Sequence, residues 1–175
     1  MSFLIRKIDE FPKWGQRDIL NGEQPSADAI THCLKTTDNA LSFWSIADEN
    51  KREEGVLAIV AQFDHLDAVD ILLIDRSLVE EKQLYLEPTP GLTPYTDFID
   101  KHLDATNLDY LSLGALAEVI VESIRQARHK RFRETELVDI LSNGIRAGKV
   151  QWSKLKPDVQ KKIPKIKVNT TTTER

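Results

Sequence analysis

The clearest pattern of hydrophobic and polar positions lies in the second half of the chain, where it predicts two helices. The first is expected over about residues 107–133, with apolar residues at helical spacing at Leu113, Leu116, Ala117, Ile120, Val121 and Ile124. Such a stripe covers one face of a helix and packs against a sheet or another helix. The second is expected over about residues 134–147, where Gly148 suits the C-terminal cap.

Apolar runs rich in β-branched and aromatic residues predict strands at four places: residues 2–8, 40–46, 69–75 and 84–86. The third run is almost continuously apolar, which favours a central strand that is covered on both faces. In the second run, Phe43 and Trp44 point to opposite faces because side chains alternate along a strand. We therefore expect Phe43 in the core, and Trp44 either covering the sheet or contacting a partner.

Two helices are predicted before the third strand. Ser26 is placed to cap a helix over about residues 26–36. Glu53 and Glu54 would form an acidic first turn, which favours a helix through the apolar run that ends at Phe63. The competing interpretation is a buried strand over residues 55–63, because periodicity does not separate the two in so short a run.

Prolines interrupt the pattern after the fourth strand. Three prolines and a glycine make residues 87–94 a rigid loop. After this loop, Thr93 or Thr96 is placed to cap a helix, whose apolar residues would be Phe98, Ile99 and Leu103.

These elements predict an α+β fold, in which a small mixed β-sheet is covered by helices and followed by a C-terminal helical basic segment. With 41% hydrophobic residues among 175 positions, the chain can build one sizeable core. We divide it into an α+β domain over residues 1–133, a helical appendage over residues 134–168 and a disordered tail over residues 169–175.

The distribution of charge adds an asymmetry that the apolar pattern does not show. The formal net charge of -4 comes from 24 Lys and Arg against 28 Asp and Glu. Residues 1–124 contain 10 basic and 23 acidic side chains, whereas residues 125–175 contain 14 basic and 5 acidic ones. We call these the acidic part and the basic part of the chain. Such a split favours binding of charged partners or pairing between the two parts.

Composition excludes several classes of protein. A single cysteine, Cys33, rules out an internal disulfide framework and a multi-thiolate metal site, and its apolar neighbours favour a buried structural role. No apolar run approaches the length of a membrane span, and the N-terminus lacks the order of a secretory signal. We therefore expect a cytoplasmic protein that does not enter membranes.

The strongest candidates for chemistry follow the proline-rich loop. His102 lies between Asp100 and Asp104, and a histidine held by a carboxylate can act as a general base. His65 could join them if the fold brings it close. On a helix, however, His102 would point away from the two aspartates, so we predict no metal site. Isolated glycines match no phosphate-binding loop, and we predict no cofactor.

The leading functional hypothesis is a non-enzymatic protein-interaction module. It would bind a basic protein partner through the acidic part, as an immunity or antitoxin-like inhibitor covers a toxin. The expected contact residues are Asp64, Asp67, Asp70 and Trp44.

Two alternatives use the other charged or polar groups. The first is nucleic-acid binding through Arg125, Arg128, Lys130, Arg131 and Arg133. The second is an enzyme with a site around His102 and Asp100. The basic part could instead pair with the acidic part, within one chain or between the subunits of a homo-oligomer.

Overall fold

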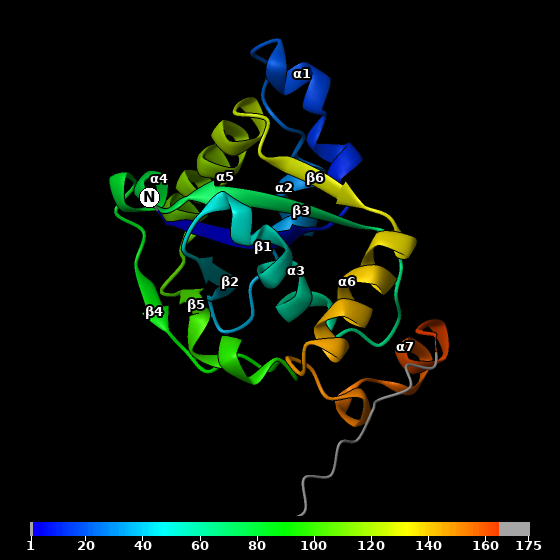
Figure 1. Ribbon diagram of the computed structural model, residues 1–175. Coiled ribbons are helices and arrows are strands. Elements are labelled where there is room, and N and C mark those ends of the chain that lie inside the picture. The colour runs from blue at the N-terminus through cyan, green and yellow to red at the C-terminus, as the bar shows by residue number, and fades with distance from the viewer. Residues whose placement is uncertain (1, 165–175) are drawn as a thin grey trace, which may run out of the picture.

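The computed structural model describes residues 2–164 and shows an α+β fold built on one six-stranded sheet (Figure 1). The strand order is β4-β5-β2-β1-β3-β6. Every strand pair is antiparallel, so the sheet is not of the mixed kind that we predicted. The strands are β1 (Phe3–Ile8), β2 (Leu41–Ile46), β3 (Val69–Asp75), β4 (Leu86–Pro88), β5 (His102–Ala105) and β6 (His129–Phe132).

The central strands place apolar side chains on both faces of the sheet. All residues of β3 are buried, as its continuous apolar run predicts. In β1, Ile5 joins one hydrophobic cluster and Leu4 joins the other. Phe43 and Trp44 of β2 are divided between the clusters in the same way. Because both faces of these strands are covered, alternation along the strand does not separate core from surface here.

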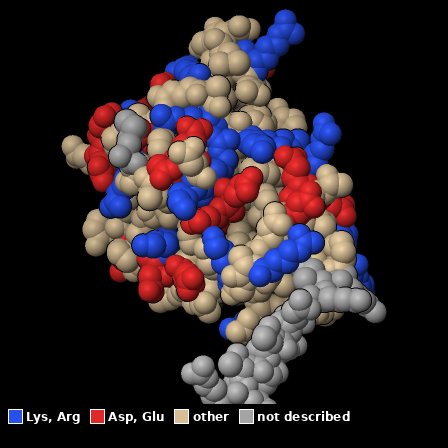
Figure 2. All heavy atoms as spheres, in the orientation of Figure 1, with Lys and Arg blue, Asp and Glu red and all other residues tan. Residues whose placement is uncertain are grey.

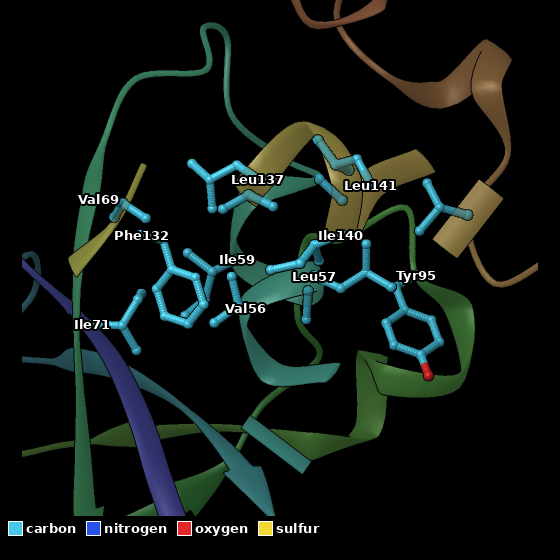
Figure 3. Close-up of a cluster of buried hydrophobic side chains, with 14 of the residues drawn as sticks. Val56, Leu57, Ile59, Val69, Ile71, Tyr95, Phe132, Leu137, Ile140 and Leu141 are labelled. Carbon is cyan, nitrogen blue, oxygen red and sulfur yellow. The ribbon is translucent and has the colours of Figure 1, made fainter. Parts of the chain in front are cut away.

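Two helices, α3 (Arg52–Val60) and α6 (Glu134–Arg146), cover the first face. Figure 3 shows Val56 and Ile59 of α3 on the side of the strand residues Ile71 and Phe132, and Leu57 beside Ile140 of α6. The helix prediction for this apolar run is therefore confirmed over the competing strand. Glycines allow the close approach: a Cβ atom at Gly144 would lie 2.8 Å from Cδ2 of Leu57.

The second face is covered by η1 (Phe11–Trp14), α1 (Gln16–Leu20), α2 (Ala27–Cys33), α4 (Arg76–Glu81) and α5 (Tyr110–Arg125). The predicted cap of α2 is confirmed, because the backbone N–H of Ala29 donates to Oγ of Ser26 at 3.2 Å. Cys33 is buried in this layer. In α5, the predicted apolar stripe faces the sheet, where Leu116 and Ile120 are fully buried.

The predicted helix over residues 107–133 is wrong in its last part. The helix α5 ends at Arg125, and residues 129–132 form the edge strand β6. The chain reverses at Ala127, which has a φ of 55°, and the backbone N–H of Arg128 then donates to the carbonyl of Ser123 at 3.1 Å. A left-handed residue with such a bond ends a helix. Glycine usually marks this position, and its absence here hid the helix end.

The predicted helix containing Phe98, Ile99 and Leu103 is also wrong in part. A 3-10 helix, η3 (Thr96–Lys101), is followed directly by the strand β5. Leu103 and Ala105 are buried, whereas His102 and Asp104 are half-buried, which is the alternation of a strand. The short strand predicted at 84–86 lies two residues later, at β4.

The C-terminal segment contributes to the first hydrophobic cluster. Leu137 and Leu141 of α6 belong to the cluster that contains Val56 of α3. After α6 come η4 (Trp152–Lys154) and α7 (Pro157–Lys162), and α7 adds Val159. The division of the chain at residue 133 into a domain and an appendage stays a prediction. The tail over residues 169–175, which we predicted to be disordered, lies outside the described residues.

Within residues 2–164, none of the helices has both the length and the apolar character that crossing a membrane requires.

Candidate functional site

The two oppositely charged parts of the chain are not two poles of the molecule. Figure 2 shows Lys and Arg lying beside Asp and Glu across the face that carries α3 and α6. Many of the contacts join the basic part to the acidic part. They include Arg128–Asp75 at 3.6 Å, Arg131–Asp70 at 2.8 Å, Lys149–Glu54 at 3.1 Å and Lys156–Asp64 at 3.6 Å.

One of these contacts belongs to a group of side chains that centres on the buried Asp70 in β3. One carboxylate oxygen lies 2.9 Å from Nε2 of His129 and the other accepts a hydrogen bond from Arg131 at 2.8 Å. The ring of Phe11 stacks on the imidazole with a centroid distance of 3.4 Å. Asp70 therefore holds the edge strand β6 against β3, and its side chain is only 9% exposed.

Other cations of the basic part are held by single acids. The hydrogen bond to Glu54 raises the pKa of Lys149. Lys130 lies 3.4 Å from Glu136, which also accepts from the backbone N–H of Arg133. That backbone hydrogen bond lowers the pKa of Glu136. These contacts stabilise the protonation states that make the ion pairs.

The candidate nucleic-acid residues do not lie on one helix face. Arg125 ends α5, where its Nε donates to the carbonyl of Ile19 at 3.5 Å. Arg128 follows in the turn, Lys130 and Arg131 belong to β6, and Arg133 precedes α6. Since β6 is a sheet edge, its Lys and Arg side chains also discourage pairing with a strand of another molecule.

The four predicted partner contacts divide between surface and core. Asp64 and Asp67 are exposed beside a hollow of about 480 Å³ that His65 and Phe63 also line. Asp70 is 8% exposed and Trp44 only 4%. For Trp44, the structure therefore shows the sheet-covering position that the sequence left open.

The two candidate histidines lie in different parts of the fold. His65 follows α3, and its Nδ1 lies 3.3 Å from Oδ2 of Asp158. His102 begins β5 and is absent from the hollow that His65 lines. Asp100 is exposed in η3 and forms no hydrogen bond or ion pair with another described side chain.

His102 instead belongs to a chain of polar groups that joins β5, β2 and Thr89, the residue after β4. Its Nδ1 lies 2.8 Å from Oγ1 of Thr89, which donates to Oδ2 of Asp104 at 2.7 Å. The other oxygen of Asp104 accepts from Oγ of Ser42 at 2.8 Å. Because the threonine proton goes to the carboxylate, Nδ1 of His102 must be the donor to Thr89.

The hydroxyl of Ser42 donates to the carboxylate of Asp104 and not to the imidazole of His102. Ser42 and His102 therefore do not form a directly hydrogen-bonded serine–histidine pair. These hydrogen bonds join β2, β5 and Thr89 and orient the carboxylate of Asp104.

The pairing of β4 with β5 places Glu87 directly opposite Asp104 in the strand register. Two opposed carboxylates on neighbouring strands repel each other, and a cation contacting both would relieve that repulsion.

The polar chain is partly open to solvent: Ser42 is exposed, whereas Thr89, His102 and Asp104 are half-buried. Figure 1 shows α3 over β1 and β2, whereas no labelled helix lies in front of β4 and β5. We call residues 85–106 the acidic hairpin, since β4 and β5 pair and enclose the proline-rich loop and η3. Within it, Lys101 is the one Lys or Arg, and the acids are Glu87, Asp97, Asp100 and Asp104.

The acidic hairpin groups four acids without ion pairs; other acids without ion pairs in the described chain, such as Asp18 and Asp67, lie elsewhere in the acidic part. In the part of the chain that the structure describes, none of its four acids lies within 4.0 Å of a Lys or Arg nitrogen. Tyr85 and Leu92 add large apolar surface, with exposed fractions of 61% and 87%. Sequence analysis did not single out Glu87, Tyr85 or Leu92; the single basic residue over residues 83–124 was the signal that could have found them.

Among residues 2–164, the structure brings no three His, Cys, Asp or Glu side chains together in a group that could hold a metal ion. Comparison with models of known families, with curated proteins and with solved structures gives no match to this chain.

Proposed function

We propose that this protein is a non-enzymatic protein-interaction module that binds a basic partner through the acidic hairpin. The observation that carries the proposal is the set of four carboxylates without a paired cation, next to the exposed side chains of Tyr85 and Leu92. Elsewhere the basic part neutralises acids such as Asp70 and Glu54. An inhibitor of immunity or antitoxin type that covers a basic toxin is one form of this function.

The chemistry of the surface supports this form of recognition. Complementary charge raises the association rate and rejects partners of the same sign. Exposed aromatic and aliphatic side chains supply the apolar centre on which tight binding depends. Pro88 lies in the edge strand β4 and has no backbone N–H, so addition of a partner strand at this edge is disfavoured. Contact through side chains of the hairpin is therefore favoured.

The structure supports the alternatives less well. Most of the arginines proposed for nucleic acid are already engaged, Arg128 with Asp75 and Arg131 with Asp70. Phosphates would have to compete with these carboxylates. The enzyme alternative pairs His102 with Asp100, but the hydrogen-bond partner of Nδ1 of His102 is Thr89.

Neutralising the hairpin is expected to weaken binding of a cationic probe. In the variant Glu87→Gln/Asp97→Asn/Asp100→Asn, we expect the Kd for a lysine oligomer to rise about tenfold at low salt, because exposed charge pairs contribute roughly 0.5 kcal/mol each. The dependence of Kd on salt should flatten as well, since fewer charges are screened. Titration by fluorescence anisotropy at two salt concentrations measures both quantities.

The matched control removes the same charge from acids outside the hairpin that have no ion pair in the described residues, as Asp18→Asn/Glu23→Gln/Asp28→Asn. We expect this variant to change the Kd for the lysine oligomer by less than about threefold. Equal weakening by both variants would show a general effect of net charge and would contradict the proposed site.

A further inference from the structure

A hollow lies on the opposite side of the sheet from α3, between α2, α4 and α5. It has a volume of about 680 Å³ and follows α5 from Gly114 to Arg125. At about 1.5 Å per residue, this is roughly three helical turns. We call it the α5 groove. We call the apolar part of its lining the floor; it includes Ile30, Leu78, Gly114, Ala117 and Val121.

Gly114 has no role in packing within the chain. A Cβ atom built there meets no atom within 4 Å, and the residue has no positive φ. A glycine inside a helix lowers stability relative to alanine, so its use needs a reason. By contrast, Gly55 and Gly144 allow contacts between elements of this chain. An open glycine in the floor of a groove allows the backbone of another molecule to come close.

Exposed apolar side chains continue the groove at both ends. Tyr110 is 80% and Leu111 is 65% exposed in the first turn of α5, and Tyr110 lies one turn before Gly114 on the same helix face. At the other end, the bond from Arg125 to Ile19 places α1 beside the last turn of α5, where Leu20 is 56% exposed. Three of the five exposed large hydrophobic residues in the described part of the chain therefore lie on α5 or α1 beside this groove.

The rim of the groove has an excess of acid. It contains Glu81, Glu118 and Glu122 against Lys82 and Arg125. Lys82 pairs with Glu118, and Arg125 lies 3.9 Å from Glu122, but Glu81 has no ion pair among the described residues. Glu81 therefore presents a carboxylate that a lysine or arginine of a partner could reach without competition, whereas Glu118 and Glu122 already have cations of this chain beside them.

We infer that the α5 groove docks an amphipathic helix of a partner protein, with the apolar face of that helix on Gly114 and its basic flanks on the glutamates. Binding of an amphipathic helix in an apolar groove is a recurrent mode of recognition, and the acidic rim favours a helix with basic residues beside its apolar face. A second copy of this chain fits less well, because its own α5 would bring further glutamates, Glu118 and Glu122, to an acidic rim. This inference is independent of the acidic hairpin.

Filling the groove tests the inference with a variant that should fold. Gly114→Met adds a side chain in open space and should leave the Tm unchanged or higher. The probe is a synthetic peptide of about 18 residues with leucine on one helical face and lysine on the other. We expect it to bind the wild-type protein, and we expect Gly114→Met to raise its Kd at least about tenfold. Titration calorimetry measures the affinity.

The controls decide what the binding means. Thr135→Met adds the same side chain to an exposed position of α6 and should leave Kd unchanged. A peptide with glutamate in place of lysine should bind at least about tenfold more weakly. The inference is overturned if the lysine peptide does not bind, if Gly114→Met and Thr135→Met behave alike, or if the glutamate peptide binds as well. A wild-type dimer that Gly114→Met dissociates in sedimentation would assign the groove to a second copy and would also overturn it.

Failure of this inference and failure of the proposed function give different results. If the Glu87→Gln/Asp97→Asn/Asp100→Asn variant loses the leucine–lysine peptide and Gly114→Met keeps it, the hairpin is the binding site and the groove inference fails. If Gly114→Met alone loses that peptide, and the hairpin variant binds the lysine oligomer normally, the groove inference stands and the proposed function fails.

Discussion

Replacing Trp44 with alanine is expected to lower the free energy of unfolding by about 3–5 kcal/mol, the largest effect among our predictions. The indole is only 4% exposed, and its ring centroid lies 6.0 Å from that of Phe98 and 4.8 Å from that of His102. A Cβ atom at Gly91 would collide with the indole ring, so the proline-rich loop also lies directly on it. Trp44→Ala leaves a cavity under this loop, η3 and β5.

Urea denaturation and a thermal scan measure this loss, which corresponds to a fall in Tm of about 10 °C for a chain of this size. The matched control is Tyr85→Ala in the same hairpin. Since Tyr85 is 61% exposed, its removal should change stability by no more than about 0.5 kcal/mol. A loss below about 1 kcal/mol for Trp44→Ala would contradict the buried position of Trp44 and would support its predicted contact with a partner.

Replacing Asp70 with alanine should cost about 3 kcal/mol. Removal of one member of a buried ion pair costs about 3–5 kcal/mol because its partners keep their desolvation without their counter-charge. We expect the lower end, since the side chain of Arg131 is 55% exposed and water can solvate it again. His129, at 12% exposure and stacked on Phe11, has less access to water.

Two further variants isolate the cause of this loss. Asp67→Ala removes an exposed acid three residues away that has no ion pair in the described chain, and should cost no more than about 0.5 kcal/mol. Arg131→Ala should cost less than about 1 kcal/mol, because the Arg131 side chain is largely exposed and solvent screens its interaction with Asp70. Equal losses in Asp70→Ala and Asp67→Ala, measured by urea denaturation, would show that Asp70 does not hold β6 in place.

The two predictions also separate structural from recognition residues. Asp70 was expected to contact a basic partner as one of the acids of the acidic part, and Trp44 was expected either to cover the sheet or to contact a partner. In the fold, each has neighbours that explain its presence without a partner: Phe98 and His102 for Trp44, and His129 and Arg131 for Asp70. Asp64 and Asp67 stay exposed, and their predicted role in binding stays a prediction.

The sequence by itself determined the elements whose signals are local. The apolar stripe of α5 and the continuous run of β3 repeat with the period of the structure they form, so each can be recognised without knowledge of its neighbours. The cap at Ser26 and the acidic first turn of α3 are local in the same sense. The α+β class followed from these elements.

Tertiary structure decided the short edge strands and the location of charge. Four-residue strands such as β5 and β6 carry too few apolar residues to show a period, and pairing with β2 and β3 makes them strands. Which charged side chains contact one another also depends on the pairing of strands that are far apart in the sequence. Asp70 and His129 are 59 positions apart in the sequence, and only the pairing of β3 with β6 brings them within 2.9 Å. The acids left without cations, and the groove beside Gly114, follow from that three-dimensional pairing and packing.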